Sequence, residues 1–259
     1  LITKHKRHDR IFAGVGMFII ISLTITLLVL FLDLVFDGYP RFNLDFLTNF
    51  PSRRATAAGI LSAWVGSSLV LIVTFFAAVP LGIAAGVYLE EYAKKNWFSD
   101  LIEINVTNLA GVPSIIYGLL ALGLFVYSFG LGQTILTAGL TLALLMLPIV
   151  IVATREAIRA IPIHIREAAY AVGATKWQVS LHHVIQYSYG GILTGVIIGM
   201  ARAIGETAPV ITIGALTFIA FLPPSPVGLE PPFINFEWLE AGFTVLPIQM
   251  FNWISRPQM

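Results

Sequence analysis

Two residues of opposite charge lie four positions apart in an apolar stretch, and they are the strongest candidates for chemistry in this sequence. Arg202 and Glu206 are the charged residues of segment 188–222. A spacing of four puts both side chains on one face of a helix. Since an isolated charge at the centre of a bilayer costs about 2.5–3.5 kcal/mol, we expect this face to look into the protein interior or onto a hydrated path.

Two interpretations of this pair are open. Arg202 and Glu206 could form an internal salt bridge that locks two helices, or Arg202 could offer its guanidinium to a passing anion. A guanidinium binds two oxygens of an oxyanion at once and stays protonated. Glu206 would then hold Arg202 in place and keep anion binding weak, as a transport path requires. We favour the path, because ionisable residues inside membranes default to functional roles, and we add Thr207 as a nearby hydroxyl donor.

A second polar cluster surrounds Gly111-Val112-Pro113. Pro113 has no backbone N–H, so it frees a carbonyl of the preceding turn. Asn108 and Ser114 flank this point and could line the same path. Hydrogen bonding between helices is an equally good use for Asn and Ser, so both interpretations stay open for these two residues.

A polar stretch, 163–178, separates two apolar segments and predicts two short helices. Its apolar residues recur at the helical spacing i, i+3, i+4, i+7: they are Ile165, Ala168, Ala169 and Val172. Pro162 suits a helix start, and Gly173 suits a left-handed helix end. Thr175 and Gln178 have the form of a capping box, which would open the second helix. A helix, a glycine turn and a second helix at a membrane surface can dock on a soluble partner.

The composition identifies the class of protein that carries these residues. The chain has 259 residues, of which 57% are hydrophobic and 11% are charged, whereas a soluble domain has about 25% charged residues. Several stretches approach or exceed the roughly 20 apolar residues that cross a bilayer. The fold class is therefore all-α, a polytopic membrane protein of about six transmembrane helices.

The expected spans are 11–32, 59–88, 101–128, 134–154, 188–222 and 239–255. Pro209 should kink or divide the fifth span. We expect one integral membrane domain over 1–259. It would consist of a basic tail with a first span (1–32), a core (about 59–255) and a cytoplasmic loop (about 155–187) within that core.

The distribution of basic residues orients the spans. Eleven Lys and Arg residues fall in segments that are inside if the N-terminus is inside: Lys4, Lys6, Arg7, Arg10, Lys94, Lys95, Arg155, Arg159, Arg166, Lys176 and Arg256. Three fall outside: Arg41, Arg53 and Arg54. The positive-inside rule then places both termini and the 155–187 loop in the cytoplasm. The proline-rich segment 223–238 is expected to be an irregular outside loop.

Several function classes lack a candidate site. The chain has no Cys, and the adjacent His182 and His183 do not share a helix face, so we expect no metal site. The sequence contains no phosphate-binding loop, no zinc-protease motif and no nucleophile-elbow motif. We therefore expect no catalytic residues, and ATP would have to be bound by another chain. A net charge of +1 gives no information about a nucleic-acid partner, and we expect none.

Four stretches resemble a known family. Glu167-Ala168-Ala169, followed after three residues by Gly173, is similar to the docking loop of ABC importer permeases. Segments 108–118, 201–209 and 246–253 resemble the permeases of bacterial phosphate-specific importers, in particular the second, or A, permease. The resemblance runs from about residue 59 to the end.

The resemblance implies a fold and a set of partners. It implies the ABC importer permease fold in the bacterial plasma (inner) membrane, paired with a homologous second permease. Two ATP-binding subunits would dock on the cytoplasmic side and a phosphate-binding protein on the outside. This chain would bind no cofactor, while ATP and Mg²⁺ would belong to the partner subunits.

The resemblance also assigns residues. It places Arg202 and Glu206 on the anion path and Glu167, Ala168, Ala169 and Gly173 in coupling. With the helix-turn-helix argument, the expected docking set is Arg166, Glu167, Ala168, Ala169, Gly173, Thr175, Lys176 and Trp177. Beyond Trp177 the sequence departs from the family's Ile-x-Leu-Pro tail, and we assign no coupling role there. Pro209 is the expected hinge.

Three alternatives remain at this point. The chain could be a permease for another oxyanion, such as sulfate or molybdate. It could be a secondary carrier that uses Arg202 and Glu206 as an ion relay. It could also be a membrane scaffold that binds partners without moving a solute.

Overall fold

The computed structural model of this chain describes residues 2–54, 57–94, 96–228 and 233–255. These residues form helices joined by irregular segments, with one isolated bridge between Val227 and Ile234 and no named strand among them. The all-α class is therefore confirmed. Several residues used in the orientation and loop predictions lie outside the described residues: Lys95, Glu230, Pro231, Pro232 and Arg256.

The chain divides into two compact units, Leu1–Gly59 and Ile60–Met259. The division follows contacts within the chain, so the expectation of one membrane domain over 1–259 stays a prediction. The first unit contains α1 (Ile2–Gly38), a short 3₁₀ turn and α2 (Leu44–Thr48). The large apolar side chains of α1 are exposed to the surroundings, as a lipid-facing span requires.

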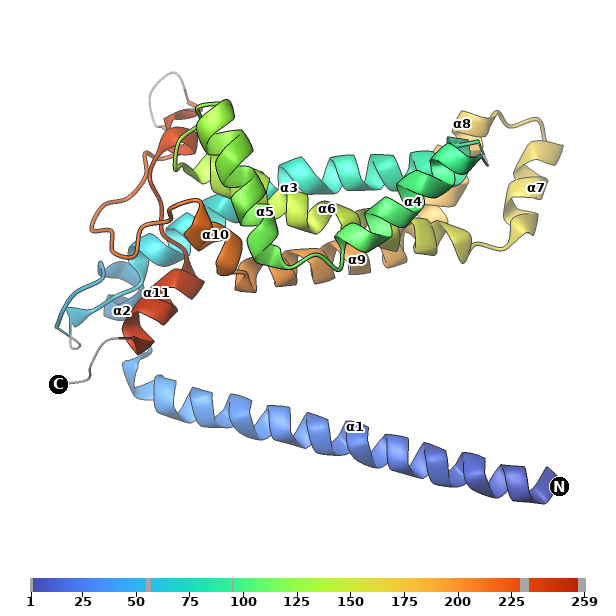
Figure 1. Cartoon of the computed structure of the whole chain (residues 1–259), viewed down its shortest axis with the longest axis horizontal. Coiled ribbons are helices and arrows are strands. Elements are labelled where there is room, and N and C mark those ends of the chain that lie inside the picture. Colours follow the sequence, from blue (N-terminus) through green and yellow to red (C-terminus); the bar gives the residue numbers. More distant parts are fainter. Residues whose placement is uncertain (1, 55–56, 95, 229–232, 256–259) are drawn as a thin grey trace. The chain divides into compact units, whose positions relative to one another are not determined.

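Three long helices form the frame of the second unit: α3 (Leu61–Val87), α6 (Ile135–Arg159) and α9 (Ile185–Gly205). They run side by side, with α6 packed against both of the others (Figure 1). Gly82 of α3 lies so close to Val150 of α6 that an added Cβ would overlap with that side chain. Glycine at this position thus allows the two helices to pack closely.

The expected span 101–128 is two helices with a sharp bend. Its first part is α4 (Trp97–Leu109), and its second is α5 (Ser114–Ala121) with a π-helical extension, Leu122–Ser128. The two parts are bent by 105°. Pro113 stands at the bend as the N-cap of α5, because proline cannot donate to the preceding turn and disfavours helix in the residue before it.

The expected span 188–222 is also divided. Helix α9 ends at Gly205, and α10 (Ala208–Thr212) follows after a break at Glu206 and Thr207. Pro209 occupies one of the first two positions of α10, where its missing N–H leaves no partner unsatisfied. The predicted division near Pro209 is therefore confirmed, with the break on its N-terminal side.

The last expected span, 239–255, differs from the prediction. Residues 241–245 belong to no helix, and α11 (Leu246–Ile254) begins only at Leu246. Pro247 favours a helix start at this point. In the described parts of the chain, four helices are long and apolar enough to span a membrane, or five if the bent pair is one span.

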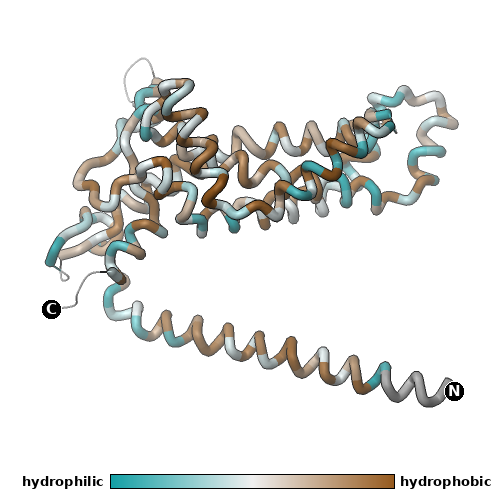
Figure 2. Tube along the Cα trace, viewed as in Figure 1, coloured by the Kyte–Doolittle hydropathy of each residue, from teal (hydrophilic) through white to brown (hydrophobic). Residues whose placement is uncertain are grey.

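The polar loop between α6 and α9 lies at one end of the long helices. Helix α6 continues beyond the expected boundary to Arg159, and α7 (Ile163–Ala171) and α8 (Lys176–Val179) follow. A π-helical turn, Ser180–Val184, then joins α8 to α9. Figure 2 shows the polar residues gathered over α7 and the adjoining helix ends, whereas the long helices are mainly apolar.

Candidate substrate path and coupling loop

The Arg202–Glu206 pair forms as its spacing predicted. Arg202 Nε donates to Glu206 Oε1 over 3.3 Å. Glu206 is the C-cap of α9 and has extended backbone angles (φ −78°, ψ 123°), so its carboxylate lies just beyond the last turn. The Arg202 side chain is 40% exposed and that of Glu206 is 18% exposed. No second acceptor binds the guanidinium among the described residues, which leaves its other N–H groups available to an anion.

Glu206 lines a small cavity between α3, α6 and the break after α9. The lining residues are Ser67, Val70, Leu71, Leu142, Ala203, Ile204, Glu206, Val210 and Val245. Ser67 and Glu206 are the polar members of this set, and Ser67 Oγ accepts from the backbone N–H of Leu246 over 2.9 Å. Arg202 is not in the lining. Glu206 therefore faces this cavity, whereas Arg202 is bonded to Glu206 and is the more exposed member of the pair.

Tyr117 is a neighbour of Arg202 that the sequence reasoning did not single out. It is buried in α5 and lies within electrostatic range of Arg202. Its hydroxyl donates to the carbonyl oxygen of Leu109 over 2.7 Å. That bond links α5 to the end of α4 across the bend at Pro113. The feature of the sequence that could have identified Tyr117 is the position of its hydroxyl, three residues after the Gly111–Ser114 segment.

The remaining path candidates occupy the two helix breaks. Thr207 is the N-cap of α10, but its side chain makes no capping hydrogen bond. Asn108 is exposed near the end of α4, and Ser114 is half-buried at the start of α5. Among the described residues, no hydrogen bond joins Asn108 or Ser114 to Arg202 or Glu206. Their role in a path therefore stays a prediction.

The coupling loop has the predicted local structure. Pro162 is the N-cap of α7, and Gly173 follows the helix with φ +86°, a value that strains any residue with a Cβ. Thr175 and Gln178 form a capping box at the start of α8. In it, the Thr175 backbone N–H donates to Gln178 Oε1 over 2.8 Å. The helix, glycine turn and second helix are confirmed.

Packing divides the apolar residues of this loop between two faces. Ala169 is buried with four apolar residues of the neighbouring helices and their connections: Ile158, Ile161, Val179 and Val184. Val172, in contrast, is 85% exposed, and Trp177 and Tyr170 are also exposed. Glu167 and Ala168 lie on the exposed side with them. The loop therefore has one face against its own chain and one apolar face without a cover in this chain.

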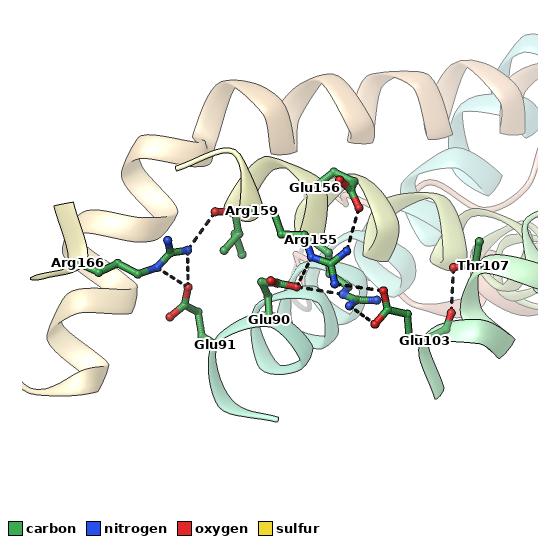
Figure 3. Close-up of polar contacts among 9 residues, drawn as sticks. Glu90, Glu91, Glu103, Thr107, Arg155, Glu156, Arg159 and Arg166 are labelled. Atoms are coloured by element: carbon green, nitrogen blue, oxygen red, sulfur yellow. Dashed lines mark hydrogen bonds and ion pairs between the residues drawn. The ribbon is translucent and has the colours of Figure 1, made fainter. Parts of the chain in front are cut away.

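An ionic cluster near the coupling loop was missed by the sequence reasoning. Arg155 and Arg159, one helical turn apart on α6, each contact both Glu90 and Glu103 (Figure 3). The shortest distances are 2.7 Å for Arg155 Nη2 to Glu103 Oε2 and 2.9 Å for Arg159 Nε to Glu90 Oε2. The cluster joins the end of α3 to α4 and α6. One indication of this cluster was present in the sequence. Glu90 and Glu103 lie at the expected cytoplasmic ends of two spans, and Arg155 and Arg159 lie at the expected cytoplasmic end of another.

Arg166, a predicted docking residue, is directed toward its own chain. Its guanidinium pairs with Glu91 and also donates to backbone carbonyls of the α6 end. Lys176, in the same predicted set, lies over the ring of Tyr92, with Nζ 4.9 Å from the ring centroid. Contact of either residue with an ATP-binding subunit stays a prediction. Among the described residues, no group of three His, Asp or Glu side chains is arranged to hold a metal ion.

The chain matches the family described as "Binding-protein-dependent transport system inner membrane component" over residues 78–227. It is 32% identical over 224 residues to the "Probable ABC transporter permease protein YqgI" of Bacillus subtilis, covering 86% of this chain and 71% of that protein. It is 30% identical over 244 residues to a "Phosphate transport system permease protein PstA" of Haemophilus influenzae, covering 92% and 84% of the two chains.

A third relative extends the comparison to another bacterial group. The chain is 35% identical over 202 residues to the "Phosphate transport system permease protein PstA" of Mycobacterium leprae, covering 78% of this chain. The chain spans 62% of that relative's length.

Proposed function

This chain belongs to the family of binding-protein-dependent transport system inner membrane components, and we propose that it is a permease subunit of an ATP-driven importer of inorganic phosphate. The observation that carries the proposal is its similarity, over 92% of its length, to a phosphate transport system permease. The uncovered guanidinium of Arg202 at a helix break supports the same assignment. Transport components of this family are not enzymes, and hydrolysis of ATP belongs to a separate chain.

Arg202 would bind the anion, and Glu206 would set how tightly it binds. The fork of a guanidinium matches two oxygens of a phosphate. Because Glu206 accepts from Arg202 Nε, the anion competes with a carboxylate that is always nearby. A path needs such competition, since a tight site would retain its cargo. Thr207, Asn108 and Ser114 would supply further donors along the path.

The partner subunits would occupy opposite ends of the long helices. We assign the exposed face of α7 and α8, with Glu167, Ala168 and Trp177, to an ATP-binding subunit. Two such subunits would bind ATP and Mg²⁺, a homologous permease would complete the path, and a phosphate-binding protein would deliver the anion from outside. In this arrangement the N-terminus and the 155–187 loop are cytoplasmic. The apolar exposure of Val172 and Trp177 supports a protein cover at this face.

Movement of the ATP-binding subunits would reach the path through the helices. Closure would displace α7 and α8, and the long helices would carry the displacement to the break between α9 and α10. Pro209 would act as the hinge, because the backbone already leaves the helix at Glu206 and Thr207. Access to Arg202 would then alternate between the two sides of the membrane.

Reconstitution of the purified complex in vesicles tests this function. We expect uptake of labelled phosphate that requires both ATP and the binding protein, with unlabelled sulfate and molybdate failing to compete. Competition by either anion would reassign the substrate. Uptake by this chain alone under a proton gradient would replace the proposal with a secondary carrier.

A further inference from the structure

The segment that ends α3 contacts each part of the coupling loop through a different residue. Glu90 pairs with Arg155 and Arg159 at the end of α6. Glu91 pairs with Arg166 of α7, and the Tyr92 ring lies under the ammonium group of Lys176, the first residue of α8. Three consecutive side chains therefore reach three different elements (Figure 3 shows the first two contacts).

The helix type changes where these three residues lie. Residues Tyr88–Tyr92 form a π-helical turn at the end of α3. The turn closes with a bond from the backbone N–H of Ala93 to the carbonyl oxygen of Tyr88, over 2.8 Å. This i to i+5 pattern widens the helix, and such turns occur frequently at functional sites.

The contact between Glu91 and Arg166 is largely enclosed by the protein. The Glu91 side chain is 7% exposed and that of Arg166 is 20% exposed. Arg166 Nε and Nη2 both donate to Glu91 Oε1, over 3.1 and 2.9 Å. The pair is thus held by two hydrogen bonds and is largely removed from solvent. Dissolved salt screens such a buried ion pair less than an exposed one.

Arg166 also caps the end of α6. Its Nη2 donates to the carbonyl oxygen of Ile158 over 3.0 Å, and its Nη1 to that of Ile161 over 3.2 Å. The last carbonyls of a helix have no partner within the helix and carry a partial negative charge. One guanidinium on α7 therefore holds the ends of both α3 and α6, which makes the three elements one mechanical unit.

Helix α3 connects this unit to the cavity at Glu206. Ser67, Val70 and Leu71 of α3 line the cavity with Glu206, while Glu91 lies at the other end of the same continuous helical segment. Helical rise over the 24 positions from Ser67 to Glu91 corresponds to about 36 Å. A displacement received at Glu91 is therefore carried to the wall of the candidate path.

We propose that Glu91 is a positioning residue that transmits movement of the coupling loop into α3 through Arg166. The proposal rests on the proposed function as a transport permease and extends it to a residue outside the docking face and the anion path. With the Glu91 carboxylate present, α7 and α3 move together when the ATP-binding subunits close. Without its charge, α7 loses its direct ion pair with α3 and keeps only its contacts with the end of α6, so less anion is imported for each ATP hydrolysed.

Transport assays of the assembled complex form the first test. The variant Glu91→Gln keeps the side-chain shape and removes the charge. We expect about a 10-fold loss of uptake, within the usual range of a coupling effect, with normal assembly and ATP hydrolysis. Glu156→Gln is the matched control, because Glu156 is an exposed carboxylate that contacts Arg159 one turn away on α6. It should leave uptake unchanged.

A double-mutant cycle identifies the contact itself. If Glu91 acts through Arg166, the combined variant Glu91→Gln, Arg166→Gln should transport no worse than the poorer single variant. Additive losses would overturn the proposal. So would normal uptake by Glu91→Gln, or failure of that variant to assemble, which would indicate a purely structural role.

Distance measurements test the link without any anion. The chain contains no native Cys, so spin labels at His164→Cys on α7 and Phe76→Cys on α3 report only that pair; both native side chains are exposed. We expect the distance to stay the same when a non-hydrolysable ATP analogue is added, and to change in the Glu91→Gln background. A change in the unmodified background, or none in the variant, would overturn the link. If the complex imports a different anion, the proposal of phosphate as the substrate is wrong, but this distance test of the Glu91–Arg166 link is unaffected.

Discussion

Arg155 Nη2 lies 2.7 Å from Glu103 Oε2, and this contact joins α6 to α4 beside the coupling loop. Arg155 is almost fully buried, and its Nε also lies 3.4 Å from Glu90 Oε2. Each carboxylate of the cluster is shared with Arg159. The arrangement satisfies charges at the end of apolar helices, where single charges would be costly.

Removal of Arg155 should destabilise the chain. In Arg155→Met, the two carboxylates of Glu90 and Glu103 would share Arg159 alone, so we expect a loss of about 1.5–3 kcal/mol, the range for a hydrogen bond to a charged group. The measurement is the thermal unfolding midpoint of the purified protein in detergent. Glu156→Gln serves as the control, since it removes an exposed contact. Equal midpoints for the two variants would contradict the structural role of the cluster.

Replacement of Arg202 should abolish phosphate uptake while the complex still assembles. In Arg202→Gln, the path loses its fixed positive charge and its two-pronged donor. Arg202→Lys should retain part of the activity, because lysine keeps the charge without the planar fork. Uptake in vesicles, with co-purification of the ATP-binding subunit as the check on assembly, measures both effects. Normal uptake by Arg202→Gln would remove this residue from the path.

Replacement of Glu206 should have the opposite effect on anion binding. In Glu206→Gln, the carboxylate that competes for Arg202 is neutral, so the anion should bind more tightly and leave more slowly. We expect both KM and kcat for uptake to fall. Concentration-dependent uptake by the reconstituted complex measures the two parameters. A higher KM in this variant would show that Glu206 assists binding instead of opposing it.

A branched side chain at Gly173 should uncouple transport from ATP hydrolysis. Gly173 has φ +86°, and a residue with a Cβ costs about 1–2 kcal/mol in the left-handed region. Gly173→Val should shift α7 relative to α8 and lower the number of anions imported per ATP hydrolysed. Gly173→Asn is the matched control, because asparagine tolerates this conformation better. Equal coupling in both variants would argue against a role for the turn geometry.

Local sequence patterns were sufficient to predict those structural features that depend only on residues close together in the chain. The class followed from the long apolar segments, since a bilayer accepts little else. The turn at Gly173 and the capping box of Thr175 and Gln178 followed from conformations and bonds within a few residues. The division near Pro209 had the same basis, because proline acts on its own turn.

The prediction of the last span had a different outcome because apolar composition does not distinguish a helix from an apolar irregular segment. Residues 239–255 are apolar enough to suggest a span, but residues 241–245 form no helix and α11 begins only at Leu246. The bend of 105° at Pro113 was similarly hidden within the expected span 101–128. A proline marks where a helix can break, whereas the packing of α5 against α10 contributes to the direction in which the chain continues.

Tertiary structure alone decided which charges on different helices meet. Glu91 and Arg166 are separated by 75 positions, and no periodicity relates residues on different helices at such a distance. The same holds for Arg155 and Glu103, whose contact depends on how α4 lies against α6. Ion pairs between helices are set by close packing and crossing geometry, which involve the whole chain, whereas caps and turns are set by bonds that a short segment makes with itself.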